Sequence, residues 1–207
     1  MTDAFAERAA GWDANPVRAA VGYAFYEEVL RAHPDFAGRM ALEFGCGTGT
    51  LGLRLGLAHQ ARVIFVDTSP AMLDVLRGKI AAQGPADAQV LLGELADLPL
   101  PETSVDAILS GMALHHVVDV PGALRQFRRL LKPGGLALVG DLMPEDGSFH
   151  GPEPAPHNGF DPLELAGAFT ASGFAPRTHH VFHILKKPDA AGTLREYRLF
   201  FLAAQAV

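Results

Sequence analysis

The sequence predicts an α/β fold in which helices cover both faces of a doubly wound, mostly parallel sheet. Short β-rich runs alternate with helix-like segments along most of the 207 residues. This alternation is typical of parallel strands joined by right-handed crossovers. Residues 64–66 and 136–139 are continuously apolar, as strands that are buried on both faces tend to be. A chain of this length most simply forms one domain.

Seven segments carry the strand pattern, and the last two lie near the C-terminus. They are residues 41–44, 63–67, 90–93, 107–110, 136–141, 181–185 and 197–203. Each is a short run rich in apolar residues, and polar or turn-forming residues separate it from the next.

The segments between the strands carry helix signals. Ser69 and Pro70 predict a helix start, because a capping hydroxyl precedes proline at the first helical position, and Met72 and Leu76 begin an apolar stripe with a spacing of four. Residues 51–57 fit a strand as well as a helix. We predict a helix there, because two parallel strands need a crossover between them.

The second half of the chain has two further helices and a long loop. Leu124, Phe127 and Leu131 mark one helix face, and the Lys-Pro-Gly-Gly sequence at 132–135 predicts the end of that helix. The Asp-Pro-Leu-Glu sequence at 161–164 has the form of a capping box. Between them, residues 142–160 are rich in proline and glycine. Loops of this length are often lids or binding segments.

Composition argues against several classes of protein. The formal net charge is −6 and the longest basic run has two residues, so no nucleic-acid partner is expected. Cys46 is the single cysteine, which excludes an intrachain disulfide. No run of about 20 apolar residues and no signal peptide is visible, so we expect no membrane insertion and a cytoplasmic location. The oligomeric state cannot be read from the sequence.

The stretch from Met40 to Gly49 predicts a ligand-binding turn. An apolar run ends in Glu43 and is followed by glycines at 45, 47 and 49. Glycine allows a sharp turn and a close approach of the backbone to a ligand. There is no Lys or Arg between Gly45 and Leu53, so the phosphate-binding P-loop is absent. The turn therefore suits a nucleoside-like ligand without a phosphate.

Polar residues follow the other predicted strands at the same edge of the sheet, where open α/β folds bind ligands. They are Asp67, Glu94, Ser110, His115, His116 and Asp141. A carboxylate after the second strand can accept hydrogen bonds from both hydroxyls of a ribose, and Asp67 stands 22 residues after Gly45, as this role requires. Glu94 can accept from an exocyclic amine, and the backbone amide of Leu95 can contact the ring.

These segments together resemble those of class I S-adenosylmethionine-dependent methyltransferases. The resemblance is to the small single-domain kind that includes ubiquinone/menaquinone-biosynthesis methyltransferases, and it covers about residues 38–186. The matching segments are 42–49 (Leu-Glu-Phe-Gly-Cys-Gly-Thr-Gly), 66–73, 93–99, 104–106, 113–116 and 130–135. Each segment alone is weak evidence, whereas their order and spacing are specific.

The resemblance implies a Rossmann-like, mostly parallel seven-stranded sheet with an antiparallel hairpin at its C-terminal edge. We expect one domain over residues 1–207, made of an N-terminal helical cap (1–37), a cofactor-binding half (38–141), a lid loop (142–160) and a C-terminal substrate-side half (161–207). The implied enzyme transfers a methyl group from S-adenosyl-L-methionine to a small-molecule acceptor by SN2 displacement, leaving S-adenosyl-L-homocysteine.

The resemblance also implies roles for individual residues. Asp67 is expected to bind the ribose hydroxyls, and Ser110 to offer its backbone near the methionyl amine. Met72 is expected near the adenine, whose edge Glu94 and Leu95 contact; many relatives have Asp where this chain has Glu94. The full set of implied cofactor-binding residues is Glu43, Gly45, Cys46, Gly47, Asp67, Thr68, Met72, Glu94, Leu95 and Ser110.

The same glycines permit a dinucleotide interpretation. The sequence from Gly47 to Gly52 fits the G-x-G-x-x-G pattern, and Asp67 lies 20 residues after Gly47, where a carboxylate that binds the NAD ribose belongs. The objection is Glu43, because a carboxylate beside this turn repels a pyrophosphate at the helix N-terminus. The sulfonium and ammonium of S-adenosylmethionine are instead favoured by a carboxylate.

The histidines leave two interpretations open. His115 is a candidate catalytic general base, since an imidazole titrates near neutral pH, or else it only shapes the pocket. His116, His150 and His157 are expected on the substrate side.

The loop histidines His150 and His157 are candidate metal ligands together with Asp141 or Glu145. The spacing of these residues matches no strong ligand signature, so no metal site is predicted. Cys46 is expected to be a small buried packing residue rather than a nucleophile.

Two further functions stay open at this stage. A cofactor-binding protein without catalysis would carry the same motifs, and its inability to form S-adenosylhomocysteine would distinguish it. Methylation of RNA is disfavoured by the acidic composition, and salt-dependent retention of tRNA would favour it again. The acceptor and its reacting atom cannot be read from the sequence.

Overall fold

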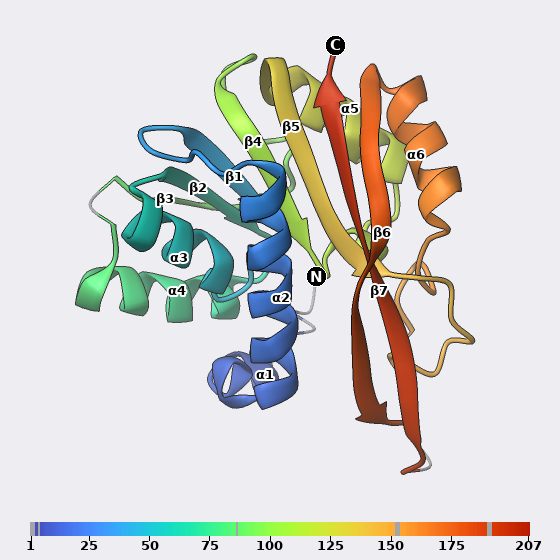
Figure 1. The fold of residues 1–207 in the computed structure, drawn as a ribbon. Coiled ribbons are helices and arrows are strands. Elements are labelled where there is room, and N and C mark those ends of the chain that lie inside the picture. The colour runs from blue at the N-terminus through green and yellow to red at the C-terminus, as the bar shows by residue number, and fades with distance from the viewer. Residues whose placement is uncertain (1–2, 4, 86, 152–153, 190–191) are drawn as a thin grey trace.

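A seven-stranded sheet lies at the centre of the molecule (Figure 1), in a computed structural model that describes residues 3, 5–85, 87–151, 154–189 and 192–207. The strand order is β3-β2-β1-β4-β5-β7-β6. Strands β1 to β5 pair in parallel, and β7 pairs antiparallel with both β5 and β6. The predicted doubly wound sheet with its antiparallel edge hairpin is therefore confirmed. The strands are β1 (Met40–Phe44), β2 (Arg62–Asp67), β3 (Gln89–Leu92), β4 (Val105–Gly111), β5 (Leu131–Leu142), β6 (Phe174–Pro188) and β7 (Leu194–Ala206).

Helices lie on both faces of this sheet. Helices α2, α3 and α4 cover one face, and α5 and α6 cover the other (Figure 1). Asn15, Ser69, Asp119 and Asp161 each accept hydrogen bonds from the first turn of the helix that follows, and proline stands in the first turn of each. The helices are α1 (Ala6–Ala9), η1 (Trp12–Ala14), α2 (Pro16–Ala32), α3 (Thr50–His59), α4 (Pro70–Gln83), η2 (Leu114–His116), α5 (Val120–Leu130) and α6 (Pro162–Ala171).

The two-sided core follows from side-chain alternation along the strands. In β1, Leu42 and Phe44 pack in the cluster that contains α5 and α6, whereas Ala41 packs in the cluster that contains α2, α3 and α4. Glu43 points to the same face as Ala41, and it is the charged residue that interrupts this otherwise apolar strand. Its place at the end of β1 brings it to the ligand-binding edge of the sheet.

Three elements differ in extent from their predictions. The helix after β4 ends at Leu130, as the Lys-Pro-Gly-Gly sequence indicated. These four residues themselves lie within β5, and the pairing of β5 with β4 shifts its register there. The hairpin strands β6 and β7 are longer than residues 181–185 and 197–203. Most of the extra positions in β6 are exposed, so they carry no burial pattern that would have marked them as a strand.

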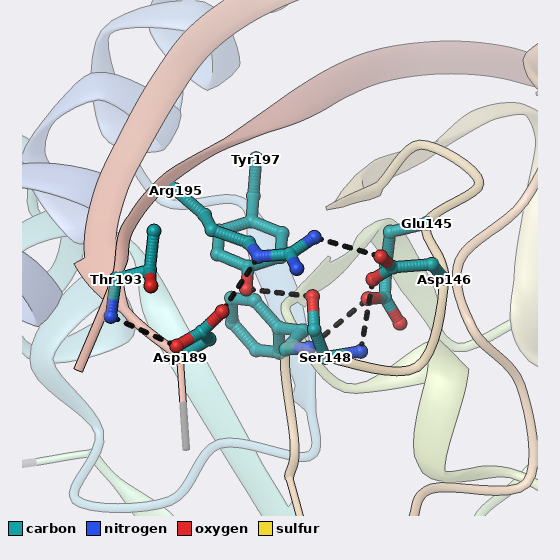
Figure 2. Close-up of polar contacts among 8 residues, drawn as sticks. Glu145, Asp146, Ser148, Asp189, Thr193, Arg195 and Tyr197 are labelled. Carbon is teal, nitrogen blue, oxygen red and sulfur yellow. Dashed lines mark hydrogen bonds and ion pairs between the residues drawn. The ribbon is translucent and has the colours of Figure 1, made fainter. Parts of the chain in front are cut away.

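The long loop after β5 is fixed to the β6–β7 hairpin by polar contacts (Figure 2). Arg195 pairs with Asp146 at 2.7 Å and with Asp189 at 2.8 Å, and the hydroxyls of Ser148 and Tyr197 are 2.9 Å apart. Two of these contacts, at Asp146 and Ser148, hold the segment that continues to His150 against the hairpin. In the described part of the chain, no helix combines the length and the apolar composition needed to cross a membrane.

Candidate functional site

A cavity of about 770 Å³ opens at the carboxyl ends of the parallel strands, between β1 and β4, where the strand order reverses. This is the place at which open α/β sheets bind ligands. Nine of the ten residues that the resemblance assigned to the cofactor line the cavity. They are Glu43, Gly45, Cys46, Gly47, Asp67, Thr68, Met72, Glu94 and Leu95.

The turn after β1 needs its glycines for two separate reasons. Gly45 has φ +63°, and a Cβ there would lie 2.3 Å from the Cβ of Ala113. The turn is held by the Cys46 amide, which donates to the Val66 carbonyl at 3.0 Å. The Cys46 side chain is 6% exposed and burial raises the pKa of its thiol, so a packing role fits this residue better than a nucleophilic one.

Glu43 lies in β1, directly before the turn. Its Oε2 accepts a hydrogen bond from the Gly52 amide at 2.9 Å, in the first turn of α3. Burial, and then the neighbouring charge of Asp67, raise the pKa of Glu43 to about 8. A carboxyl with this pKa is mostly protonated at neutral pH, whereas the sequence led us to expect a negative charge at Glu43.

The burial of Glu43 bears on the dinucleotide interpretation. A pyrophosphate binds the free amides at a helix N-terminus, and here the Gly52 amide already donates to Glu43. A cation in the cavity favours the ionised form of Glu43, whereas an anion does not. The geometry therefore favours a cationic ligand over a diphosphate.

Asp67 ends β2 beside this turn. Its carboxylate accepts hydrogen bonds from the amides of Gly47 at 2.6 Å and Ser69 at 2.8 Å, and burial raises its pKa. Lys79, whose charge acts on Glu43, pairs with Asp13 at 2.5 Å. The cavity wall thus carries two mostly buried carboxyl groups, and each has oxygen lone pairs left for a ligand.

The N-terminal segment lies over the same opening. Phe5 and Trp12 line the cavity and contact each other edge to face, with ring centroids 5.8 Å apart. Asp13 accepts from the hydroxyls of Thr48 at 2.6 Å and Thr50 at 3.2 Å, which connects η1 to the glycine turn. These contacts bring residues from the first turns of the chain to the ligand site.

Ser110 is the one assigned cofactor residue that does not line the cavity. It is fully buried in β4, and its hydroxyl has no hydrogen-bond partner among the described residues. Its neighbour Gly111 forms the wall instead. A Cβ at Gly111 would lie 2.9 Å from the ring of Phe25, and one at Gly140 would lie 2.5 Å from it, so both glycines make room for this ring.

The four histidines separate into different positions. His116 lines the cavity, while His115 lies behind it with 1% of its surface exposed. Burial, then the charges of His115 and His150, lower the pKa of His116 to about 3, and burial lowers that of His150 to about 4. His157 lies apart from this group, and its Nε2 donates to the Val117 carbonyl at 3.0 Å.

These positions bear on the general base. His115 is separated from the cavity wall, and His116 has a pKa far below neutral, which makes it a weak base. The position of His115 behind the cavity wall agrees with the alternative in which it shapes the pocket, and its role as a general base stays a prediction.

Sequence reasoning missed the apolar wall on the α2 side of the cavity. Val21 and Phe25 from α2 and Phe182 from β6 line it, and the rings of Phe25 and Phe182 are 6.0 Å apart. No motif marks these positions. The two rings come together only because α2 packs against β6 in the folded protein.

Comparisons with known proteins point to methyltransferases. A family model described as "Methyltransferase domain" matches residues 41–135. A malonyl-[acyl-carrier protein] O-methyltransferase of Serratia marcescens is 32% identical over 142 residues, which cover 69% of this chain and 52% of that protein. A demethylmenaquinone methyltransferase of Symbiobacterium thermophilum is 40% identical over 97 residues, which cover 45% of this chain and 39% of that protein.

Residues 41–135 therefore belong to the methyltransferase domain family. The matched part of the chain spans 52% and 39% of the length of these two curated relatives. A Haloferax volcanii protein, solved in complex with the Trm112 methyltransferase activator, has the same fold with a TM-score of 0.78 at 20% identity, covering 100% of this chain and 99% of that one. The family match confirms the resemblance to methyltransferases over residues 41–135.

Proposed function

We propose that this protein transfers a methyl group from S-adenosyl-L-methionine to a small-molecule acceptor. The observation that carries the proposal is the pair of carboxyl groups, Glu43 and Asp67, in a cavity at the carboxyl ends of β1 and β2. Burial raises the pKa of both groups, so a cation beside them would favour their ionised forms. The sulfonium and ammonium of the family's cofactor would supply one.

The cavity residues fit the parts of the cofactor. Asp67 would bind the two ribose hydroxyls with the lone pairs that the Gly47 and Ser69 amides leave open. Glu94 is exposed at the cavity edge and Leu95 is buried, which suits contact with the edge and the face of an adenine. Gly45 and Gly47 would allow the methionine half to lie against the backbone.

When bound, the cofactor supplies an electrophilic methyl group on a sulfonium. The chain would hold the acceptor's nucleophilic atom in line with it, and such positioning contributes on the order of 7–11 kcal/mol in favourable cases. Phe25, Phe182 and Trp12 form the apolar part of the cavity wall and would exclude water. The wall favours an acceptor with an aromatic or apolar body.

The relatives act on different acceptors, since their names give an acyl-carrier-protein malonyl group and a demethylmenaquinone. The test is therefore a panel of phenols, thiols, amines, carboxylic acids and quinone precursors, with release of S-adenosylhomocysteine as the readout. We expect turnover with at least one compound, and none from Asp67→Ala. Cofactor binding without turnover on any compound would favour the binding-protein alternative.

A further inference from the structure

Three histidine side chains meet beside the cavity, away from the residues assigned to the cofactor. His115 and His116 come from η2, and His150 comes from the loop after β5. One ring nitrogen of each lies within 4.8 Å of those of the other two. The ring centroids of His115 and His116 are 4.2 Å apart, and that of His150 is 5.0 Å from both. One nitrogen of each ring therefore lies close enough to the other two for all three to bind one ion.

Two of these imidazoles have a buried nitrogen without a partner. The Nε2 atoms of His115 and His150 are both shielded from solvent and make no hydrogen bond with any described residue. His115 as a whole is 1% exposed. Buried polar atoms are nearly always paired, so two unpaired imidazole nitrogens within one histidine cluster are candidate ligand atoms.

Asp141 orients the most buried of the three. Its Oδ1 lies 2.5 Å from Nδ1 of His115, and it also accepts from the amides of His115 at 3.2 Å and Leu142 at 2.7 Å. With Nδ1 hydrogen-bonded to this carboxylate, Nε2 is the ring nitrogen of His115 that is left for a ligand. A carboxylate behind a histidine in this way is the usual outer partner of a metal ligand.

The loop that carries His150 is held in place independently. Phe149 donates its amide to Glu145 at 3.0 Å, and the Ser148 and Arg195 contacts of Figure 2 fix the preceding residues to the hairpin. His150 therefore meets the two η2 histidines because the fold brings it there, although 34 positions separate it from His116. This distance in sequence is why no ligand spacing was visible.

We propose that His115, His116 and His150 bind one zinc ion. Three imidazole nitrogens with a fourth position left open are the ligand set of several catalytic zinc sites. His116 lines the cavity, so the open position would face the acceptor side and take a water molecule or an oxygen or sulfur atom of the acceptor. The site departs from the sequence expectation of no metal, and it does not depend on the proposed methyl transfer.

The test uses the untagged protein, stripped with EDTA and titrated with Zn²⁺ in competition with a chromophoric chelator. We expect one zinc per chain. Each of His115→Ala, His116→Ala and His150→Ala should weaken binding at least about 100-fold, because two ligands remain. His179→Ala, on the exposed face of β6, is the matched control and should bind zinc as the wild type does. Co²⁺ should give a tetrahedral absorption spectrum that is lost in the same three variants.

Asp141→Asn tests the orienting role separately, and we expect about 10- to 100-fold weaker zinc binding with the three ligands intact. S-adenosylmethionine binding by each variant, measured by calorimetry, shows whether the cofactor half is still folded. Zinc that binds the wild type no more tightly than His116→Ala would overturn the proposal, as would a folded wild type that takes up no zinc. Neither result affects the methyltransferase assay, so the two proposals fail separately.

Discussion

Glu43 should make cofactor binding depend on pH and release a proton. With a pKa of about 8, its carboxyl is ionised in roughly one free molecule in a hundred at pH 6 and about one in ten at pH 7. A bound sulfonium and ammonium favour the ionised form. If the bound carboxylate stays ionised over this range, the dissociation constant of S-adenosylmethionine should fall about ninefold from pH 6 to pH 7, with about 0.9 protons released per ligand at pH 7.

Isothermal titration calorimetry in two buffers of different ionisation enthalpy measures this release directly. Glu43→Gln keeps an oxygen that can accept from the Gly52 amide, and it should lose most of the proton release and most of the pH dependence. Glu102→Gln, an exposed carboxyl outside the cavity, should behave as the wild type. Affinity that does not change between pH 6 and pH 7 in the wild type, without proton release, would refute this account of Glu43.

Two further predictions concern the free protein. The buried Glu43 binds its proton more tightly in the folded state than in the unfolded one, so the free energy of unfolding should fall as pH rises from about 4.5 to about 8. In denaturant titrations, Glu43→Gln should remove a loss on the order of 4 kcal/mol over this range. The same dependence of unfolding free energy on pH in both proteins would contradict the assignment. Gly45→Ala should lower the free energy of unfolding by about 2 kcal/mol or more, because it combines a positive φ with a clash against Ala113. Gly22→Ala is the control: a Cβ there meets open space in the middle of α2, so this variant should not be destabilised.

The fold and the cofactor half could be predicted because they depend on local signals. A strand that ends in Glu43 and turns at Gly45, and an acidic residue at the end of β2, are properties of short segments. The same signals correctly distinguished α3 from a strand, since parallel pairing of β1 and β2 requires a crossover.

The apolar wall and the histidine cluster could not be predicted, because they depend on contacts between distant segments. Phe25 and Phe182 face one cavity only because α2 packs on β6. His150 joins the histidines of η2 only because the loop after β5 is fixed to the hairpin. The protonation state of Glu43 could not be predicted either, since its burial depends on helices that lie on one face of the sheet.

The most direct test of the central claim compares ligands in one calorimeter. We propose that the cavity between β1 and β4 binds a cationic nucleoside through Asp67 and Glu43. The wild type should therefore bind S-adenosylmethionine, and Asp67→Ala should bind it about 100-fold more weakly, since two hydrogen bonds to a charged group are lost at about 1.5 kcal/mol each or more. Firm binding of NADH with no uptake of S-adenosylmethionine, or equal affinity in the wild type and Asp67→Ala, would contradict it.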